Sequence, residues 1–153
     1  MTESTTVPVL EAIGLVRTYR GGDGQPLRVL DGATLTVHAG EMVAVIGSSG
    51  SGKSTLLQLL GALDRPDAGI VRIAGTVTGT ASDEAIAALR NRAVGFVFQF
   101  HHLLKEFTAL ENVMMPLRIA GVSAPEARDR AFALLERVGL GARGDHRPAE
   151  LSG

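Results

Sequence analysis

The stretch that decides the fold is Gly47-Ser48-Ser49-Gly50-Ser51-Gly52-Lys53-Ser54-Thr55, which fits the pattern G-x-x-x-x-G-K-[ST] at every position. The apolar run Met42–Ile46 precedes it, and a second apolar run, Leu56–Leu60, follows it. A phosphate-binding loop requires this order of strand, loop and helix. The glycines let the backbone turn tightly and direct its N–H groups at an anion. The following helix adds the positive end of its dipole, so the stretch predicts a site for a nucleoside triphosphate.

Two side chains of this loop carry most of the expected chemistry. Lys53 is placed to reach the β- and γ-phosphates, and the Ser54 hydroxyl to bind Mg²⁺. An ordinary Gly/Ser-rich turn is the alternative, but the flanking segments and the Lys-Ser pair argue against it. The nucleotide-binding residues predicted from the loop are Gly47, Ser48, Ser49, Gly50, Ser51, Gly52, Lys53, Ser54 and Thr55.

Composition narrows the possible partners and compartments. The chain has 153 residues, enough for one domain or for part of a larger one. Its 15 basic and 16 acidic residues nearly cancel, so we expect no nucleic-acid partner. The absence of cysteine excludes disulfides and thiolate metal sites. The chain shows neither a signal peptide nor an apolar run of the roughly 20 residues that span a membrane. We therefore expect a cytoplasmic protein that acts on membranes only through a partner.

The pattern along the chain predicts alternating strands and helices. Helices are expected from the loop to about Leu63, from Ser82 to about Asn91, and after the capping-box sequences at Thr108 and Ser123. In the last of these helices, one apolar face is predicted to comprise Ala127, Ala131, Leu134, Leu135 and Val138, with Gly139 as the stop. The predicted strands are 9–19, 27–37 with a break at Asp31-Gly32, 42–46, 70–73 and 94–98.

Several segments in order along the chain resemble the ATP-binding subunit of ABC transporters. They are Val29–Gly32 with Leu35 and Val37, Gly40–Ala44, the 47–55 loop, Leu63–Gly69, Gln99 and Leu151-Ser152-Gly153. The resemblance implies an α/β fold of the P-loop NTPase type, with a small antiparallel β subdomain and a helical subdomain. It also implies ATP and Mg²⁺ as cofactors, a head-to-tail homodimer of ATPase subunits, and transmembrane permease subunits as partners at the cytoplasmic face of the inner membrane.

The resemblance also implies roles for residues outside the loop. Tyr19 is similar to the aromatic residue that stacks on adenine, and Gln99 to the glutamine that coordinates Mg²⁺ and the attacking water. Together with Lys53, Gln99 is thus a predicted catalytic residue. Ser152 and Gly153 resemble the start of the signature that closes over the γ-phosphate bound by the opposite subunit.

Within the family, residues 98–116 resemble the ATPases of lipoprotein-releasing systems. The ATPases of macrolide-type and peptide exporters are similar in the same region and remain an alternative. A soluble kinase or GTPase is disfavoured because the chain contains no Asn-Lys-x-Asp motif.

The apolar strand ending in Asp-Glu that supplies the family's general base is not found in this sequence. Asp64 lies too near the loop to end a separate strand, and Glu136 lies inside the 3.6-periodic segment after Ser123. The family's γ-phosphate histidine is not found either. We therefore expect residues 1–153 to be an incomplete ATP-binding domain that hydrolyses ATP only as part of a longer protein. A non-hydrolysing nucleotide-binding fragment is the alternative. The expected layout is a β subdomain and P-loop core over about 1–98 and a helical subdomain over about 99–153.

Overall fold

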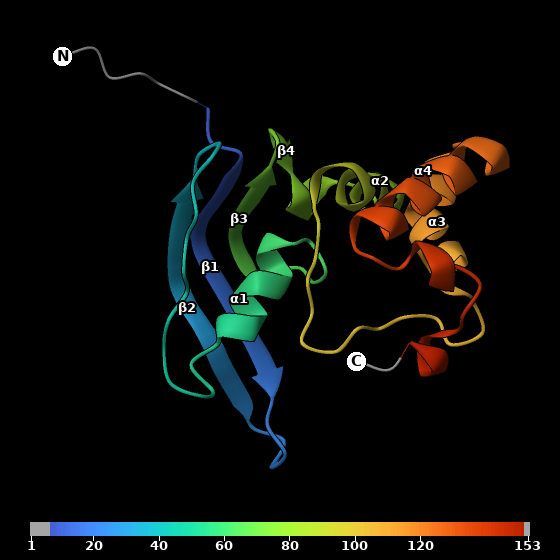
Figure 1. Ribbon diagram of the computed structural model, residues 1–153. Helices are drawn as coiled ribbons and strands as arrows, with labels where there is room; N and C mark the ends of the chain where they lie inside the picture. The colour runs from blue at the N-terminus through green and yellow to red at the C-terminus, as the bar shows by residue number, and fades with distance from the viewer. Residues whose placement is uncertain (1–6, 152–153) are drawn as a thin grey trace. The chain divides into compact units, whose positions relative to one another are not determined.

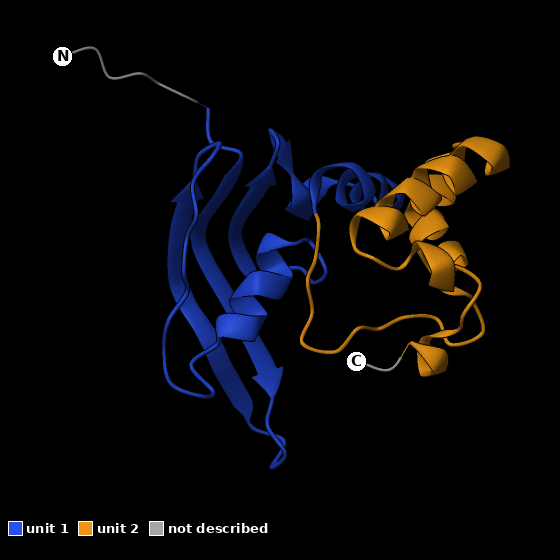
Figure 2. Ribbon diagram, in the orientation of Figure 1, with its two compact units in different colours: residues 1–94 blue, residues 95–153 orange. Residues whose placement is uncertain are grey.

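The computed structural model describes residues 7–151. The chain divides into two compact units, 1–94 and 95–153 (Figure 2). Within residues 7–151, the first unit contains the β-sheet, two α-helices and the 3₁₀ turn Thr78–Thr80, and the second contains two α-helices and two 3₁₀ turns.

An antiparallel sheet forms the first unit. Strand β1 (Leu10–Arg20) lies between β2 (Pro26–Val37) and β3 (Ala68–Ile73), and the short β4 (Thr76–Val77) extends the sheet beyond β3, as Figure 1 shows. The predicted strands 9–19, 27–37 and 70–73 are confirmed to within two residues at each end. β1 is thus paired along both of its edges.

The predicted break in β2 is a β-bulge. Leu15 pairs with Ala33 and Val16 with Asp31, so Gly32 has no partner, and its φ of 79° is one that glycine adopts without strain. A second irregularity follows, because Arg17 pairs with Leu30 while Thr18 pairs with Arg28. Val29 is therefore left out of the ladder as well.

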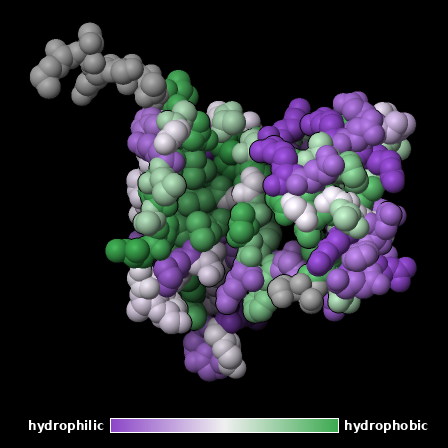
Figure 3. Space-filling view, in the orientation of Figure 1, coloured by the Kyte–Doolittle hydropathy of each residue, from purple (hydrophilic) through white to green (hydrophobic). Residues whose placement is uncertain are grey.

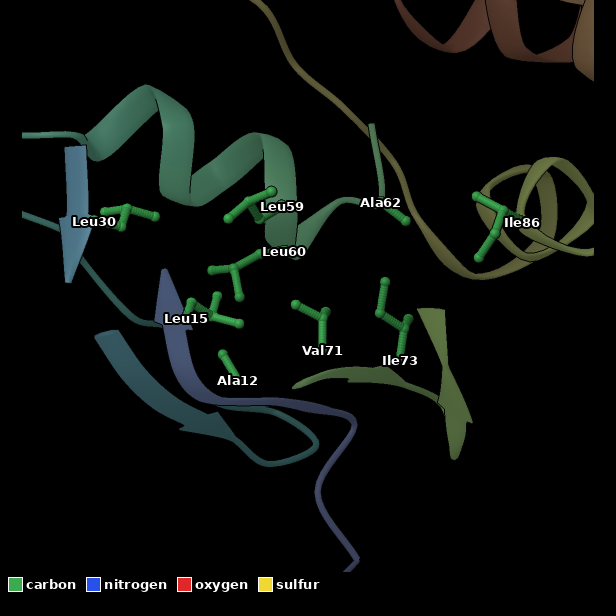
Figure 4. Packing of buried hydrophobic residues seen from close by; sticks show 9 residues of the cluster. All are labelled: Ala12, Leu15, Leu30, Leu59, Leu60, Ala62, Val71, Ile73 and Ile86. Carbon is green, nitrogen blue, oxygen red and sulfur yellow. The ribbon is translucent and has the colours of Figure 1, made fainter. Parts of the chain in front are cut away.

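The core of the first unit lies between the sheet and helix α1 (Lys53–Leu60). Figure 4 shows Leu59 and Leu60 directed from α1 toward Leu15 and Val71 of the strands. Leu15, Leu59 and Val71 are essentially inaccessible to solvent, and burying each contributes roughly 1.5–3 kcal/mol. Helix α1 ends at Leu60 rather than the predicted Leu63, because Ala62 turns into the left-handed region at φ 54°.

Helix α2 (Asp83–Ala93) completes the first unit. The side chain of Ile86, on this helix, is buried in the core cluster of the first unit. The Ser82 hydroxyl accepts a hydrogen bond from the Ala85 N–H, so the predicted cap is confirmed. The helix extends two residues beyond the predicted Asn91.

The two apolar segments predicted as strands, 42–46 and 94–98, are not strands in the described part of the chain. Met42 is 99 % exposed, Ile46 89 % and Val97 102 %. A strand forms only when a neighbour completes its ladder of hydrogen bonds, and within residues 7–151 no segment pairs with either one. Both strand predictions are wrong for this structure.

Surface hydropathy differs between the two units. Figure 3 shows a largely hydrophobic surface on the viewed face of the first unit and a largely hydrophilic surface on the second. The exposed large hydrophobic residues of the first unit include Met42, Val43 and Ile46. An apolar surface of this kind is unusual for a protein surface that stays in water.

Helices α3 (Ala109–Ile119) and α4 (Ala124–Arg137) form the second unit and enclose its core. The capping box at Thr108 is confirmed: the Glu111 N–H donates to Thr108 Oγ1 over 3.2 Å, and the Thr108 N–H donates to Glu111 Oε2 over 2.8 Å. The box at Ser123 is wrong, because its hydroxyl makes no capping bond. Glu126 instead lies 3.5 Å from Arg130 one turn along the helix. The core cluster consists of Ala109, Leu110, Ala131 and Leu135.

The apolar face predicted on α4 is narrower than expected. Ala127, Ala131 and Leu135 are buried, but Leu134 and Val138 are 46 % and 68 % exposed. The stop at Gly139 is confirmed by its φ of 75° and by its N–H, which donates to the Glu136 carbonyl.

The side-chain amide of Asn112, on α3, fastens the segment that precedes this helix. The two hydrogens of its Nδ2 are shared among the carbonyls of Leu104, Phe107 and Thr108, which lie 3.1, 3.1 and 2.9 Å away. Its Oδ1 accepts a hydrogen bond of 2.9 Å from the Leu104 N–H. After α4 the chain continues through the 3₁₀ turns Gly141–Arg143 and Pro148–Glu150. Over residues 7–151, no helix has the length and apolar character needed to cross a bilayer.

Candidate nucleotide-binding site

The loop at 47–55 leads directly into α1, as its sequence predicts. Gly50 and Gly52 have φ values of 80° and 88°, which only glycine adopts readily. Gly52 is the N-cap of α1, and its carbonyl accepts the first helical hydrogen bond from the Leu56 N–H at 2.8 Å. The order of loop and helix is confirmed, whereas the segment before the loop has no regular secondary structure.

Close packing also requires glycine at position 52 of the loop. A Cβ at Gly52 would lie 2.9 Å from the Val29 carbonyl oxygen and 3.0 Å from Leu30 Cδ2. A Cβ at Gly47 would meet only side chains, with Ser51 Oγ nearest at 2.6 Å, and the serine hydroxyl can rotate away. Val29 is the residue left out of the β1–β2 ladder, so the bulge brings its carbonyl against the start of α1.

Lys53 folds back over its own loop. Its Nζ donates to the carbonyl oxygens of Gly47 and Ser48 over 2.9 and 2.6 Å. The ammonium is therefore held inside the curve of the glycine-rich backbone, where a positive charge attracts an anion. The exposed Ser54 follows it in the first turn of α1, at the positive end of the helix dipole. This arrangement can bind a phosphate group and place a hydroxyl oxygen beside it.

Tyr19 is the second-last residue of β1 and is half-buried. Its hydroxyl donates to Asp64 Oδ2 over 3.2 Å, and the guanidinium carbon of Arg17 lies 4.8 Å from its ring centroid. Arg17 and Thr18 pair with the two neighbours of Val29, and Val29 contacts Gly52. The first unit thus brings Tyr19 and the loop to the same part of the sheet.

Three charged residues around Tyr19 were not predicted from the sequence as site residues: Arg17, Asp64 and Asp67. Arg17 Nη2 lies 2.7 Å from Asp64 Oδ2, and its Nη1 lies 2.9 Å from Asp67 Oδ1. Hydrogen bonding with Tyr19 and the nearby carboxylates raises the pKa of Arg17. The Thr18 N–H, and then Arg17, lower the pKa of Asp67. The only sequence signal was the position of both aspartates in 63–69, because contacts 47 to 50 residues apart leave no local pattern.

The other predicted site residues lie elsewhere. Gln99 belongs to the second unit, and its side chain is exposed. Ser152 and Gly153 lie outside the described residues. Leu151 before them packs, partly buried, against the α3–α4 core.

Comparison with known proteins agrees with this fold and loop. The ABC transporter family model matches residues 30–153. The chain therefore belongs to the ABC transporter family, and its fold is that of the P-loop ATPases.

Within the family, the chain is similar to the ATP-binding proteins of lipoprotein-releasing systems. The chain is 58 % identical over 145 residues to the lipoprotein-releasing system ATP-binding protein LolD of Chromohalobacter salexigens, and 57 % identical to LolD of Pseudomonas fluorescens. Each match covers 95 % of this chain, but only 61 % and 63 % of the respective relative. The chain thus spans about three fifths of the length of the curated relatives it matches.

A solved structure shows the same fold. The ATP-binding cassette MJ0796, described as a dimer in a post-hydrolysis state bound to ADP and Pi, superimposes with a TM-score of 0.84 at 35 % identity. The superposition covers 94 % of this chain and 63 % of that one.

Proposed function

We propose that this chain belongs to the ATP-binding subunit of an ABC transporter, one that couples ATP binding and hydrolysis to the release of lipoproteins from the bacterial inner membrane. The observation that carries the proposal is the 47–55 loop, with its sterically required Gly52 and the Lys53 ammonium held inside its curve. The relatives, which are 51–58 % identical to this chain, are named as ATP-binding proteins of lipoprotein-releasing systems, and this supports lipoproteins as the transported substrate.

In this proposal MgATP binds at the loop. The backbone of Gly47, Ser48, Ser49, Gly50, Ser51, Gly52 and Thr55 surrounds the phosphates, and Lys53 neutralises their charge. The Ser54 hydroxyl would hold Mg²⁺, the family resemblance implies Gln99 as a further ligand, and Tyr19 would stack on the base. The donor set fits, because hydroxyl and amide oxygens are the ligands that Mg²⁺ prefers. Bound Mg²⁺ neutralises charge on the triphosphate, and this chain's residues bind and orient the nucleotide.

The proposed assembly is a head-to-tail dimer of ATPase subunits on transmembrane permease subunits, at the cytoplasmic face of the inner membrane. Ser152 and Gly153 would then meet the nucleotide bound by the opposite subunit. The solved cassette MJ0796 is described as dimeric, which supports the dimer. The proposed division of labour follows the layout of about 1–98 for the core and about 99–153 for the helical subdomain.

We propose further that residues 1–153 alone do not turn over ATP. Asp64 follows α1, whose Leu59 and Leu60 are helical, and it is bonded to Arg17 and Tyr19. Glu136 lies exposed on α4. Neither carboxylate ends a strand, so neither is a candidate for the general base. Phosphate release above background by this polypeptide alone would contradict the proposal.

The test of the proposed function is Lys53→Ala in the native protein assembled with its membrane partners. We expect loss of MgATP binding by calorimetry and loss of ATP-dependent lipoprotein release from reconstituted vesicles. Lys105→Ala removes the chain's other lysine, which is exposed and outside the loop, and should leave MgATP binding unchanged. Lipoprotein release that persists in Lys53→Ala overturns the proposal. Release of a macrolide or a peptide instead would favour the exporter alternative.

A further inference from the structure

We propose that Arg17 and Asp64 are positioning residues for the Tyr19 ring, which they hold with one face covered so that a single base can stack on the other. This inference rests on the proposed function, since it concerns how the base of the nucleotide is received. It assigns a role to two charged residues that lie outside the phosphate-binding loop.

The Arg17 guanidinium is held in a fixed position by two carboxylates. Its Nη1 donates to Asp67 Oδ1 over 2.9 Å, and its Nη2 lies 2.7 Å from Asp64 Oδ2. Asp67 is held in turn by the Thr18 N–H, which donates to its Oδ2 over 2.7 Å. Two carboxylates on separate nitrogens determine the plane of a guanidinium, because its donors form a rigid fork. The Arg17 side chain is only 22 % exposed, so solvent competes little for it.

The Arg17 guanidinium lies over one face of Tyr19, 4.8 Å from the ring centroid, within the range of a cation–π contact. That face is closed to a base, and only the opposite face is left for stacking. The Tyr19 hydroxyl donates to Asp64 Oδ2, the same oxygen that Arg17 approaches. The ring is therefore held by its polar end and by one face.

Asp64 and helix α1 connect the Tyr19 ring to the phosphate-binding loop. Asp64 comes four residues after the end of α1, and α1 begins at Lys53. Its Oδ1 also accepts a hydrogen bond from the Arg65 N–H over 2.8 Å, which fixes the carboxylate to the backbone after the helix. Because α1 is packed on the sheet through Leu59, ring and loop belong to one compact unit. A base and its phosphates would meet a preorganised pair of contacts, which reduces the entropy lost on binding.

An ion-pair network that only joins β1 to the segment after α1 would have the same contacts. The two roles differ in what their loss would do. A purely structural network, once broken, would lower stability and weaken every ligand of the unit alike. A positioning network would weaken only ligands that carry a base.

The experiment measures the affinity of the native protein for MgATP and for magnesium tripolyphosphate, which has no base. In Asp64→Asn and in Arg17→Met we expect MgATP to bind about 5- to 10-fold more weakly, the order of one lost cation–π contact or charged hydrogen bond. Tripolyphosphate affinity should be unchanged. The effect on hydrolysis should appear in KM and not in kcat.

Glu11→Gln is the matched control. It breaks the ion pair between Glu11 and Arg72, which joins β1 to β3 in the same sheet but does not touch Tyr19. Its affinity for both ligands should equal that of the wild type. Tyr19→Phe removes only the hydroxyl. In the double variant with Asp64→Asn, the loss of MgATP affinity should be smaller than the product of the losses in the two single variants. Tyr19→Phe also provides the test if the charged variants do not fold.

The outcomes separate the two proposals. Unchanged MgATP affinity in Asp64→Asn, Arg17→Met and Tyr19→Phe overturns the positioning role while leaving the proposed function intact. Parallel weakening of both ligands also overturns it, in favour of a purely structural network. A wild-type protein that binds neither ligand overturns the proposed function, and the positioning role with it.

Discussion

Strand β1 and the segment 42–46 are both rich in apolar residues, but their environments in the structure are opposite. β1 is paired on both edges, and its Ala12 and Leu15 are fully buried. Segment 42–46 has no partner within residues 7–151, and Met42 and Ile46 are almost fully exposed. Apolar composition makes a segment suitable for a strand, but pairing decides whether one forms. The same sequence signature can therefore have two outcomes in one chain.

Hydrogen exchange tests this contrast most strongly. In the 1–153 polypeptide, amides of β1 around Leu15 should exchange at least about 100-fold more slowly than those of 42–46, because only the former are held in a ladder. Exchange followed by mass spectrometry gives both rates in one sample. Equal protection of the two segments would show that 42–46 is paired in solution.

Core truncation sharpens the contrast in terms of energy. Leu59→Ala should lower the free energy of unfolding by about 2–5 kcal/mol, because it leaves a cavity between α1 and the sheet. Met42→Ala, at a side chain that is 99 % exposed, should change it by less than about 0.5 kcal/mol. Urea unfolding of the 1–153 polypeptide measures both. A large loss in Met42→Ala would mean that this segment packs against the core.

The capping boxes offer the same contrast on helices. Thr108→Ala removes a formed box and should cost about 1 kcal/mol. Ser123→Ala removes a hydroxyl that makes no capping bond and should cost clearly less. Thermal unfolding of the two variants would rank them. The reverse order would show that the Ser123 cap forms in solution.

The smallest expected effect concerns Asp67 and pH. Its pKa is lowered from the ordinary value of 3.8, first by the Thr18 N–H and then by Arg17, so its ionised form stabilises the fold. This contribution is complete above the ordinary value and is lost as the pH falls through the lowered one. In Asp67→Asn, stability should therefore fall less steeply with acid below about pH 4. Parallel acid-unfolding curves for variant and wild type would contradict it.

Local sequence signals predicted most of the elements but not their long-range contacts. The glycine-rich loop, the break at Asp31-Gly32 and the Thr108 box each depend on neighbouring residues, and each appears in the structure, the break as a β-bulge. The strand at 42–46 failed because pairing is not a local property. The Ser123 box was wrong, because the Ser123 hydroxyl makes no capping bond and Glu126 lies against Arg130 instead.

The residues of the candidate site differ in the same way: some belong to local sequence patterns and others meet only through long-range contacts. The loop could be predicted from one local pattern, whereas the role of Tyr19 is implied only by the family resemblance and stays a prediction. Arg17 and Asp64 could not be predicted, since their contact joins residues 47 positions apart. Their spacing matches no motif, and each alone resembles an ordinary surface charge.

The four hydrogen bonds of the Asn112 amide have a chemical consequence. Hydrolysis of this side chain to aspartate would replace the donating nitrogen with a negatively charged oxygen. That oxygen would face the carbonyls of Leu104, Phe107 and Thr108, which also carry negative partial charge. Deamidation at this single position would thus place negative charge against three carbonyl oxygens and weaken the attachment of residues 104–108 to α3.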